Sequence, residues 1–201
     1  MRIARLFVIA TAMLATVAIV GAQDKGGKGK GGGKGGFQLP PMIHITIADF
    51  PDGGHIPAKY TCAAGQTSPS PAISWTGAPA NTASYVVIFH DPDPVLGGSA
   101  VNDVLHWAIF DIPGDATGLP EGVKMGTQAD GSVNIKNMGN SNGYMGPCPP
   151  AGHGDHHYTF EVYALSAKLG LPDTTSRADL LAAMNGKVIA KGVYIGMFGQ
   201  K

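Results

Sequence analysis

Three short stretches of this 201-residue chain combine residue types that can bind a ligand or do chemistry. The first is Asp91-Pro92-Asp93-Pro94, directly after an apolar run, and the second is His106-Trp107. The third, Gly143 to Leu165, reads GYMGPCPPAGHGDHHYTFEVYAL and joins a stiff loop to a regular alternating pattern. A loop that only reverses the chain needs about two to five residues. The length and composition of this loop therefore indicate a further role.

Each of the two aspartates is followed by a proline, which restricts the backbone and disfavours a helix at this point. We therefore predict that the chain itself orients both carboxylates, while His106 returns at the head of the next strand. The alternative is a turn that uses Asp-Pro only for its geometry.

Side chains of a strand that begins at His156 alternate between its two faces. His156 and Tyr158 then share one face with Phe160, while His157 lies on the other. An imidazole and a phenol beside a Gly-Pro loop with backbone N–H groups predict a site for phosphate or carboxylate. The alternative is a hydrogen-bonded histidine of the core.

Catalysis and metal binding are rival interpretations of the same residues. Asp91, His106 and a hydroxyl are parts of a hydrolytic triad, but the sequence has no Gly-x-Ser-x-Gly motif, and tyrosine is a poor acyl nucleophile. Four candidate metal ligands lie near one another in the sequence: Cys148, His153, His156 and His157. Their spacing matches no zinc motif. The sequence therefore favours a non-catalytic protein with no metal and no other cofactor.

Apolar and alternating stretches predict the strands that position these residues. The expected strands are 42–50, 84–91, 105–113, 156–165 and 188–198. One helix is expected, with Ser176 as N-cap, Asp179 three residues later, and Asn185-Gly186 as its end. Strands with a few short helices on one core predict an antiparallel sheet or sandwich, either mostly β or α+β.

The first 36 residues differ in composition from the rest. Arg2 and Arg5 precede an apolar run, 6–20, and small residues precede Gln23, so residues 1–22 predict a cleaved secretory signal peptide. An uncleaved anchor is the alternative, although the run is shorter than the roughly 20 residues that span a bilayer. Residues 23–36 predict a flexible Gly/Lys-rich linker, either a spacer or a weak attachment to an anionic surface.

The predicted domain, residues 37–201, carries eight basic and thirteen acidic residues, a net charge of −5. This acidic balance argues against nucleic acid as a partner. With a cleaved signal peptide, the expected location is secreted or periplasmic, without a transmembrane anchor.

Several motifs, in their order along the chain, resemble the phosphatidylethanolamine-binding protein family, also known through the Raf kinase inhibitor protein, in its bacterial branch. These motifs are HDPDP, HW, GYMGPCPP and HHYTFEVYAL, supported by IPAKYTC, SWTGAP and GLPEG between about Ile43 and Phe198. The resemblance implies a β-sandwich of two antiparallel sheets with a few short peripheral helices. It also implies a small pocket for phosphate, phosphoethanolamine-type headgroups or carboxylates.

Carried over by position, the resemblance assigns the pocket to Asp91, His106, Gly146, Cys148, His156 and Tyr158, with Asp93, Trp107 and Pro149 in support. Two departures concern the edges of this pocket. Pro94 comes one residue earlier than in the usual Asp-Pro-Asp-x-Pro, and His157 replaces the arginine of the usual His-Arg-Tyr. We expect Asp91 to share a proton with His106 and favour its imidazolium, so that anion affinity falls as the pH rises.

The implied partner is a small anionic ligand or a phospholipid headgroup, and a homodimer is a further expectation of the bacterial branch. The resemblance leaves a second function open, inhibition of a protein such as a protease or kinase, although a signal peptide argues against an intracellular kinase. Both cysteines lie in family motifs. Outside the cytoplasm Cys62 and Cys148 either form a disulfide or remain buried thiols.

Overall fold

A computed structural model describes residues 41–65, 68–98 and 100–201 of the chain. The predicted signal peptide, 1–22, and the predicted linker, 23–36, lie outside the described residues. The strands are β1 (His44–Thr46), β2 (Gly54–His55), β3 (Ile73–Thr76), β4 (Ser84–Asp91), β5 (Val104–Pro113), β6 (Gly118–Leu119), β7 (Val133–Asn134), β8 (His156–Leu165) and β9 (Val188–Phe198). The helices are the 3-10 turns η1 (Ala58–Tyr60) and η2 (Cys62–Ala64) and the α-helices α1 (Asp93–Leu96) and α2 (Arg177–Met184).

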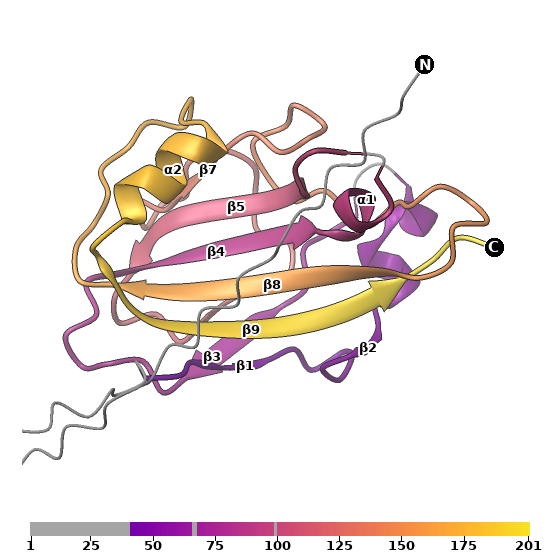
Figure 1. Ribbon diagram of the computed structural model, residues 1–201. Helices are drawn as coiled ribbons and strands as arrows, with labels where there is room; N and C mark the ends of the chain where they lie inside the picture. Colours follow the sequence, from indigo (N-terminus) through magenta and orange to yellow (C-terminus); the bar gives the residue numbers. More distant parts are fainter. Residues whose placement is uncertain (1–40, 66–67, 99) are drawn as a thin grey trace, which may run out of the picture. The chain divides into compact units, whose positions relative to one another are not determined.

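The strands form two sheets, which confirms the predicted fold class of a mostly-β sandwich with few helices. The small sheet has the order β1-β3-β6, and the large sheet has the order β2-β9-β8-β4-β5-β7. Figure 1 shows the four long strands β5, β4, β8 and β9 side by side, with β1 and β3 below them in that view. All strand pairs are antiparallel except the short pair of β2 and β9, which is parallel.

Strand β4 lies in the middle of the large sheet and is buried on both faces. On one face, Phe89 packs in a core shared with Trp75 of the small sheet. On the other face, Ile88 packs in a second core with Leu180 and Met184 of α2. Removing apolar area from water on both faces stabilises the fold at about 25 cal/mol per Å². The continuous apolar run of β4 follows from this double burial.

The sequence predicts the long elements well. β4, β8 and β9 have the expected bounds, and β5 starts one residue earlier than expected. The Ser176 hydroxyl accepts a hydrogen bond from the backbone N–H of Asp179 at 3.1 Å, so α2 begins with the predicted cap. The first predicted strand, 42–50, is wrong in length, because only His44–Thr46 pair with β3 in a ladder.

The prediction that the Asp-Pro pairs keep the chain out of a helix is wrong. Pro92 has the helical angles φ −80° and ψ −17°, and α1 begins at Asp93 with Pro94 in its first turn. Proline is tolerated there because the first N–H groups of a helix have no partner within the helix. The turn ends at Gly97, so the helix spans one turn only.

Within the described residues, none of the helices has the length and apolar character needed to cross a bilayer.

Candidate functional site

The ends of three neighbouring strands lie together at one end of the large sheet and carry the predicted site residues. β4 ends at Asp91, the antiparallel neighbour β5 begins at Val104, and the other antiparallel neighbour β8 begins at His156. This topology brings together four side chains far apart in the sequence, which we call the Asp91 cluster: Asp91, His106, His156 and Tyr158. All four are at most 8% exposed.

A β-bulge turns His106 into this cluster. Phe89 pairs with Trp107, whereas the next residue, His90, pairs with Leu105, so His106 is an extra residue in β5. Leu105 consequently packs on the α2 side of the sheet, while Trp107 packs between the sheets. The His106 ring contacts Phe89 and Tyr158 on the same side, with ring centroids 5.5 and 5.2 Å away. A bulge re-aims a side chain in this way at the end of a strand.

Asp91 binds His156, so the predicted hydrogen bond to His106 is wrong. Asp91 Oδ2 lies 2.8 Å from His156 Nδ1, and Asp91 Oδ1 accepts the backbone N–H of Asp93 at 3.0 Å. The physical reason is the register of the sheet, since β8 enters beside the end of β4. A second reason is that His106 Nδ1 already has a partner, the Met145 carbonyl, at 3.0 Å.

The contacts of His106 also define its tautomer. A carbonyl oxygen can only accept, so Nδ1 of His106 carries the proton that is donated to Met145. Burial lowers the pKa of His106 below its usual value, and the Met145 carbonyl and the Asp91 charge oppose this shift without reversing it. The expectation that His106 is held as an imidazolium is therefore wrong, and the neutral ring leaves Nε2 with a lone pair.

Tyr158 contributes a buried hydroxyl with an unmet hydrogen-bonding capacity. Its side chain is 0% exposed, and its hydroxyl makes no hydrogen bond of good geometry in the described part of the chain, although the Asp91 carboxylate and the Cys148 backbone lie near it. Burial first, and then the Asp91 carboxylate close by, raise the pKa of Tyr158 far above its usual value, so the hydroxyl keeps its proton. A buried hydroxyl without a partner costs about 1–3 kcal/mol, and it marks a position where a ligand atom would be stabilised.

Hydrogen bonds to β5 and to Tyr60 hold the predicted loop from Tyr144 to Pro150 next to the Asp91 cluster. Met145 N donates to the His106 carbonyl at 3.0 Å, and the Tyr144 hydroxyl donates to the Tyr60 carbonyl at 2.8 Å. A Cβ on Gly146 would lie 2.6 Å from that same Tyr60 carbonyl oxygen, so only glycine fits. The family resemblance assigned Gly146 to ligand binding. The packing gives a separate, structural reason for a glycine at this position.

Cys62 and Cys148 form a disulfide, which resolves the alternative between a bridge and two thiols. The bridge joins the η2 segment to the loop, next to a backbone hydrogen bond of 3.0 Å from Cys62 N to the Pro147 carbonyl. Cys148 is therefore unavailable as a metal ligand, and the predicted rival zinc set around it does not form. His153 of that set is exposed, with its ring centroid 6.2 Å from that of His156.

The three supporting residues hold the elements that carry the cluster. Trp107 is fully buried and donates from Nε1 to Asn134 Oδ1 at 2.6 Å. Asp93 Oδ2 accepts the backbone N–H of His157 at 2.7 Å and lies 3.0 Å from His157 Nδ1, which ties α1 to β8. The Pro149 carbonyl accepts from Gln200 Nε2 at 2.6 Å.

Two cavities near the loop and the sheets are lined by none of the four members of the Asp91 cluster. One of about 390 Å³ lies against the loop and is lined by Met125, Tyr144, Met145, Gly146 and the disulfide, among others. A larger one of about 570 Å³ lies between β1 and β9 and contains none of the predicted site residues. The smaller cavity therefore shares Gly146 and Cys148 with the predicted site, but none of the four members of the Asp91 cluster.

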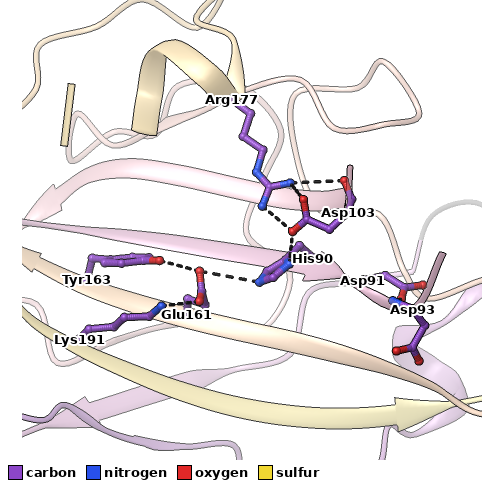
Figure 2. A network of polar contacts seen from close by, with 8 residues as sticks. All are labelled: His90, Asp91, Asp93, Asp103, Glu161, Tyr163, Arg177 and Lys191. Carbon is purple, nitrogen blue, oxygen red and sulfur yellow. Dashed lines mark hydrogen bonds and ion pairs between the residues drawn. The ribbon is translucent and has the colours of Figure 1, made fainter. Parts of the chain in front are cut away.

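The sequence interpretation missed a polar network on the opposite face of β4, drawn in Figure 2. His90 precedes Asp91 and so points to the other side of the sheet, where its Nδ1 contacts Asp103 and its Nε2 lies 3.7 Å from Glu161 Oε2. Arg177 Nη2 donates to Asp103 at 2.7 Å, and Lys191 Nζ donates to Glu161 at 2.5 Å. The alternation of β4 gave a signal for this, because His90 follows the apolar Val86 and Ile88 on the face that packs against α2.

The side-chain cations Arg177 and Lys191 hold the carboxylates of Asp103 and Glu161 in their charged form. Burial raises the pKa of Asp103, but the Arg177 guanidinium outweighs burial and the net pKa is lowered. Burial likewise raises the pKa of Glu161, and hydrogen bonds from Lys191 and Tyr163 lower it overall. The network is therefore a neutralised structural group that fastens α2 to the sheet.

Comparisons with known proteins agree with the fold. A family model described as "Phosphatidylethanolamine-binding protein" matches residues 46–199. A UPF0098 protein of Methanothermobacter thermautotrophicus is 42% identical over 158 residues, covering 78% of this chain and 98% of that protein. A putative lipoprotein, LppC, of Mycobacterium tuberculosis is 32% identical over 213 residues, covering 94% of each chain. The crystal structure of Escherichia coli YbcL, described as a new member of the mammalian PEBP family, aligns with a TM-score of 0.69 at 27% identity, covering 79% of this chain and 99% of YbcL.

Proposed function

The chain belongs to the phosphatidylethanolamine-binding protein family, and from this premise we propose that its Asp91 cluster binds a small anion without catalysing a reaction. The ligand class is a phosphate, a phosphoethanolamine-type headgroup or a carboxylate. The observation that carries this proposal is the buried Tyr158 hydroxyl, which lies near Asp91 and two histidine rings but makes no hydrogen bond of good geometry in the described part of the chain.

The tautomers of the two histidines define how the anion is held. Nδ1 of His106 donates to the Met145 carbonyl, and Nδ1 of His156 faces the Asp91 carboxylate. In the neutral rings, each Nε2 is therefore an acceptor, which repels an anion oxygen that carries no proton. Anion binding then takes up a proton, either on an imidazole or on the anion itself. Binding should therefore be stronger at lower pH, as the sequence also predicts. The reason is uptake of a proton on binding, and not an imidazolium that Asp91 maintains on His106 in the free protein.

Burial limits the size of the bound group. Asp91 and His106 are 3% and 4% exposed, so only a small part of a ligand reaches them. A phosphate or carboxylate group satisfies the Tyr158 hydroxyl, while any larger substituent stays outside, next to the exposed His153 or Cys148. This arrangement fits the headgroup of a phospholipid as well as a free anion.

We place the protein in the cell envelope or outside the cell. The name of the relative LppC, a putative lipoprotein, supports an envelope location. The apolar segment near the N-terminus fits a secretory signal, and a disulfide persists in an oxidising compartment.

A ligand-dependent melting screen tests the proposed binding. Inorganic phosphate, phosphoethanolamine and acetate are added to the wild type, to Tyr158→Phe and to the control Tyr163→Phe. Tyr163 lies on the same strand but on the other face, where its hydroxyl donates to Glu161 at 2.6 Å. We expect at least one anion to raise the melting temperature of the wild type and of the control, but not of Tyr158→Phe.

The stability of the free variants separates binding from folding. Because Tyr158→Phe removes an unsatisfied hydroxyl, its melting temperature without ligand should be equal to or higher than that of the wild type. The proposal fails if none of the three anions stabilises the wild type. It also fails if Tyr158→Phe responds to them as the wild type does.

A further inference from the structure

Three potential metal ligands meet at the end of β4 and the start of β8. One oxygen from each of Asp91 and Asp93 and one nitrogen from His156 lie within 4.8 Å of one another. The shortest of these separations, between Asp91 Oδ2 and His156 Nδ1, is 2.8 Å. Ligand atoms around a tetrahedral zinc ion are roughly 3.3 Å apart, given bond lengths near 2.0–2.1 Å. Small side-chain rotations therefore bring the three donors to bonding distance of one ion.

The charge around these carboxylates is not neutralised by protein cations. In the described part of the chain, Asp91 and Asp93 pair with the histidines His156 and His157, and neither carboxylate forms an ion pair with lysine or arginine. Asp91 is buried, and two carboxylates that share a site repel each other. A cation is the group that this arrangement lacks.

The other face of β4 shows the contrast. There, too, a histidine lies between two acids, His90 between Asp103 and Glu161, but Arg177 and Lys191 bind those acids directly (Figure 2). Figure 2 also shows Asp91 and Asp93 close together at the end of β4, away from both cations. The same strand thus carries one neutralised acid–histidine group and one that is not neutralised.

We propose that Asp91, Asp93 and His156 bind one divalent metal ion that accepts mixed imidazole and carboxylate ligands, such as Zn²⁺ or Mn²⁺. The buried Tyr158 hydroxyl lies beside Asp91, makes no hydrogen bond of good geometry in the described part of the chain, and would donate to a water or anion on the ion's open positions. The exposed His153 ring, with its centroid 6.2 Å from that of His156, is a candidate for a further ligand. The family resemblance placed these three residues in one pocket, but their metal role was not predicted, because the ligands come from two segments more than sixty residues apart and form no local metal motif.

The test uses the metal alone. The purified protein is treated with EDTA, dialysed and titrated calorimetrically with ZnCl₂ and with MnCl₂, and bound metal is counted by elemental analysis. The variants are Asp93→Asn and His156→Gln. The matched control is His55→Gln, because His55 Nε2 pairs with Asp155 Oδ2 at 2.8 Å in an exposed His–Asp pair elsewhere. A melting curve of each metal-free variant verifies that it folds. The decision rests on Asp93→Asn, because Asp93 is half-buried and asparagine has the same shape as aspartate.

We expect one equivalent of Zn²⁺ or Mn²⁺ to bind the wild type and His55→Gln, with an affinity at least tenfold lower in Asp93→Asn. The proposal is overturned if neither metal binds stoichiometrically, or if Asp93→Asn binds as tightly as the wild type. Equal loss in His55→Gln would also overturn it, since binding would then be to surface histidines. No phosphate is present, so the result does not depend on whether the cluster binds anions.

Discussion

The disulfide between Cys62 and Cys148 should be the largest single contribution to the stability of the loop behind the Asp91 cluster. It links η2 to the loop across a sequence separation of 86 residues. Replacing both cysteines by serine removes the link and leaves the loop held by hydrogen bonds such as those of Tyr144 and Pro147. The double variant should therefore fold, but with a lower free energy of unfolding.

The magnitude follows from the entropy of the unfolded chain. Closing a loop of this length costs the unfolded state about 15 cal/mol/K, which corresponds to about 4.6 kcal/mol at 25 °C. Measured effects of disulfides are commonly smaller, so we expect the double variant to lose between about 2 and 4.6 kcal/mol. For a domain of this size, that loss lowers the melting temperature by roughly 5–15 °C.

Urea unfolding of the oxidised wild type and of Cys62→Ser/Cys148→Ser measures this loss. The slope of the free energy with urea should rise in the variant, because its unfolded chain is less compact. Wild type reduced with dithiothreitol serves as a second sample without substitutions and should match the variant. A loss below 1 kcal/mol with an unchanged slope would refute the reasoning, since the bridge would then not constrain the unfolded chain.

Three further predictions concern packing and charge. Gly146→Ala should cost about 1–3 kcal/mol, because a Cβ there would lie 2.5 Å from Ser68 Oγ. Gly97→Ala is the control and should be near neutral, because a Cβ there would lie 3.5 Å from the Asp93 carbonyl oxygen, an ordinary contact. Equal losses in urea unfolding would count against the close packing at Gly146. Burial lowers the pKa of His106, so the unfolded state binds more protons than the folded state and His106 makes stability fall as the pH drops below about 6.5. The free energy of unfolding should therefore decrease more between pH 7.5 and 5.5 in the wild type than in His106→Gln. Identical pH profiles of the two proteins would exclude this contribution of His106. Arg177→Met leaves Asp103 without its cation and should cost about 1–2 kcal/mol at pH 7 in urea unfolding; the exposed Lys168→Met should cost almost nothing, and a similar effect of both would show that the Arg177 pair contributes little.

The local pattern of the sequence was sufficient for the strands and for one wall of the site. The period of two in β8 places His156 and Tyr158 on the buried face and His157 on the exposed face, as the structure confirms. The Ser176 cap and the end at Asn185 likewise depend on neighbours in sequence. Both features arise from interactions within a few residues, which a sequence displays directly.

Features that depend on pairing between distant segments could not be predicted. The bulge that turns His106 exists only in the register of β5 against β4, and the partner of Asp91 depends on where β8 enters the sheet. The Arg177 contact to Asp103 crosses 74 residues. The error at α1 was of another kind, because the rule that proline disfavours helices does not hold in a helix's first turn.

The ring nitrogens of the histidines test the central claim most directly. Long-range ¹H–¹⁵N spectra of the EDTA-treated, ¹⁵N-labelled protein at pH 7 distinguish a lone-pair Nε2 from one that carries or shares a proton. Before phosphate is added, His106 should show a protonated Nδ1 and a lone-pair Nε2, because its Nδ1 donates to Met145. With saturating phosphate, the Nε2 signals of His106 and His156 should move towards the protonated range, while those of the exposed His44 and His55 stay in place. Phosphate that binds without moving either signal would contradict the account, and so would a failure of phosphate, phosphoethanolamine and acetate all to bind.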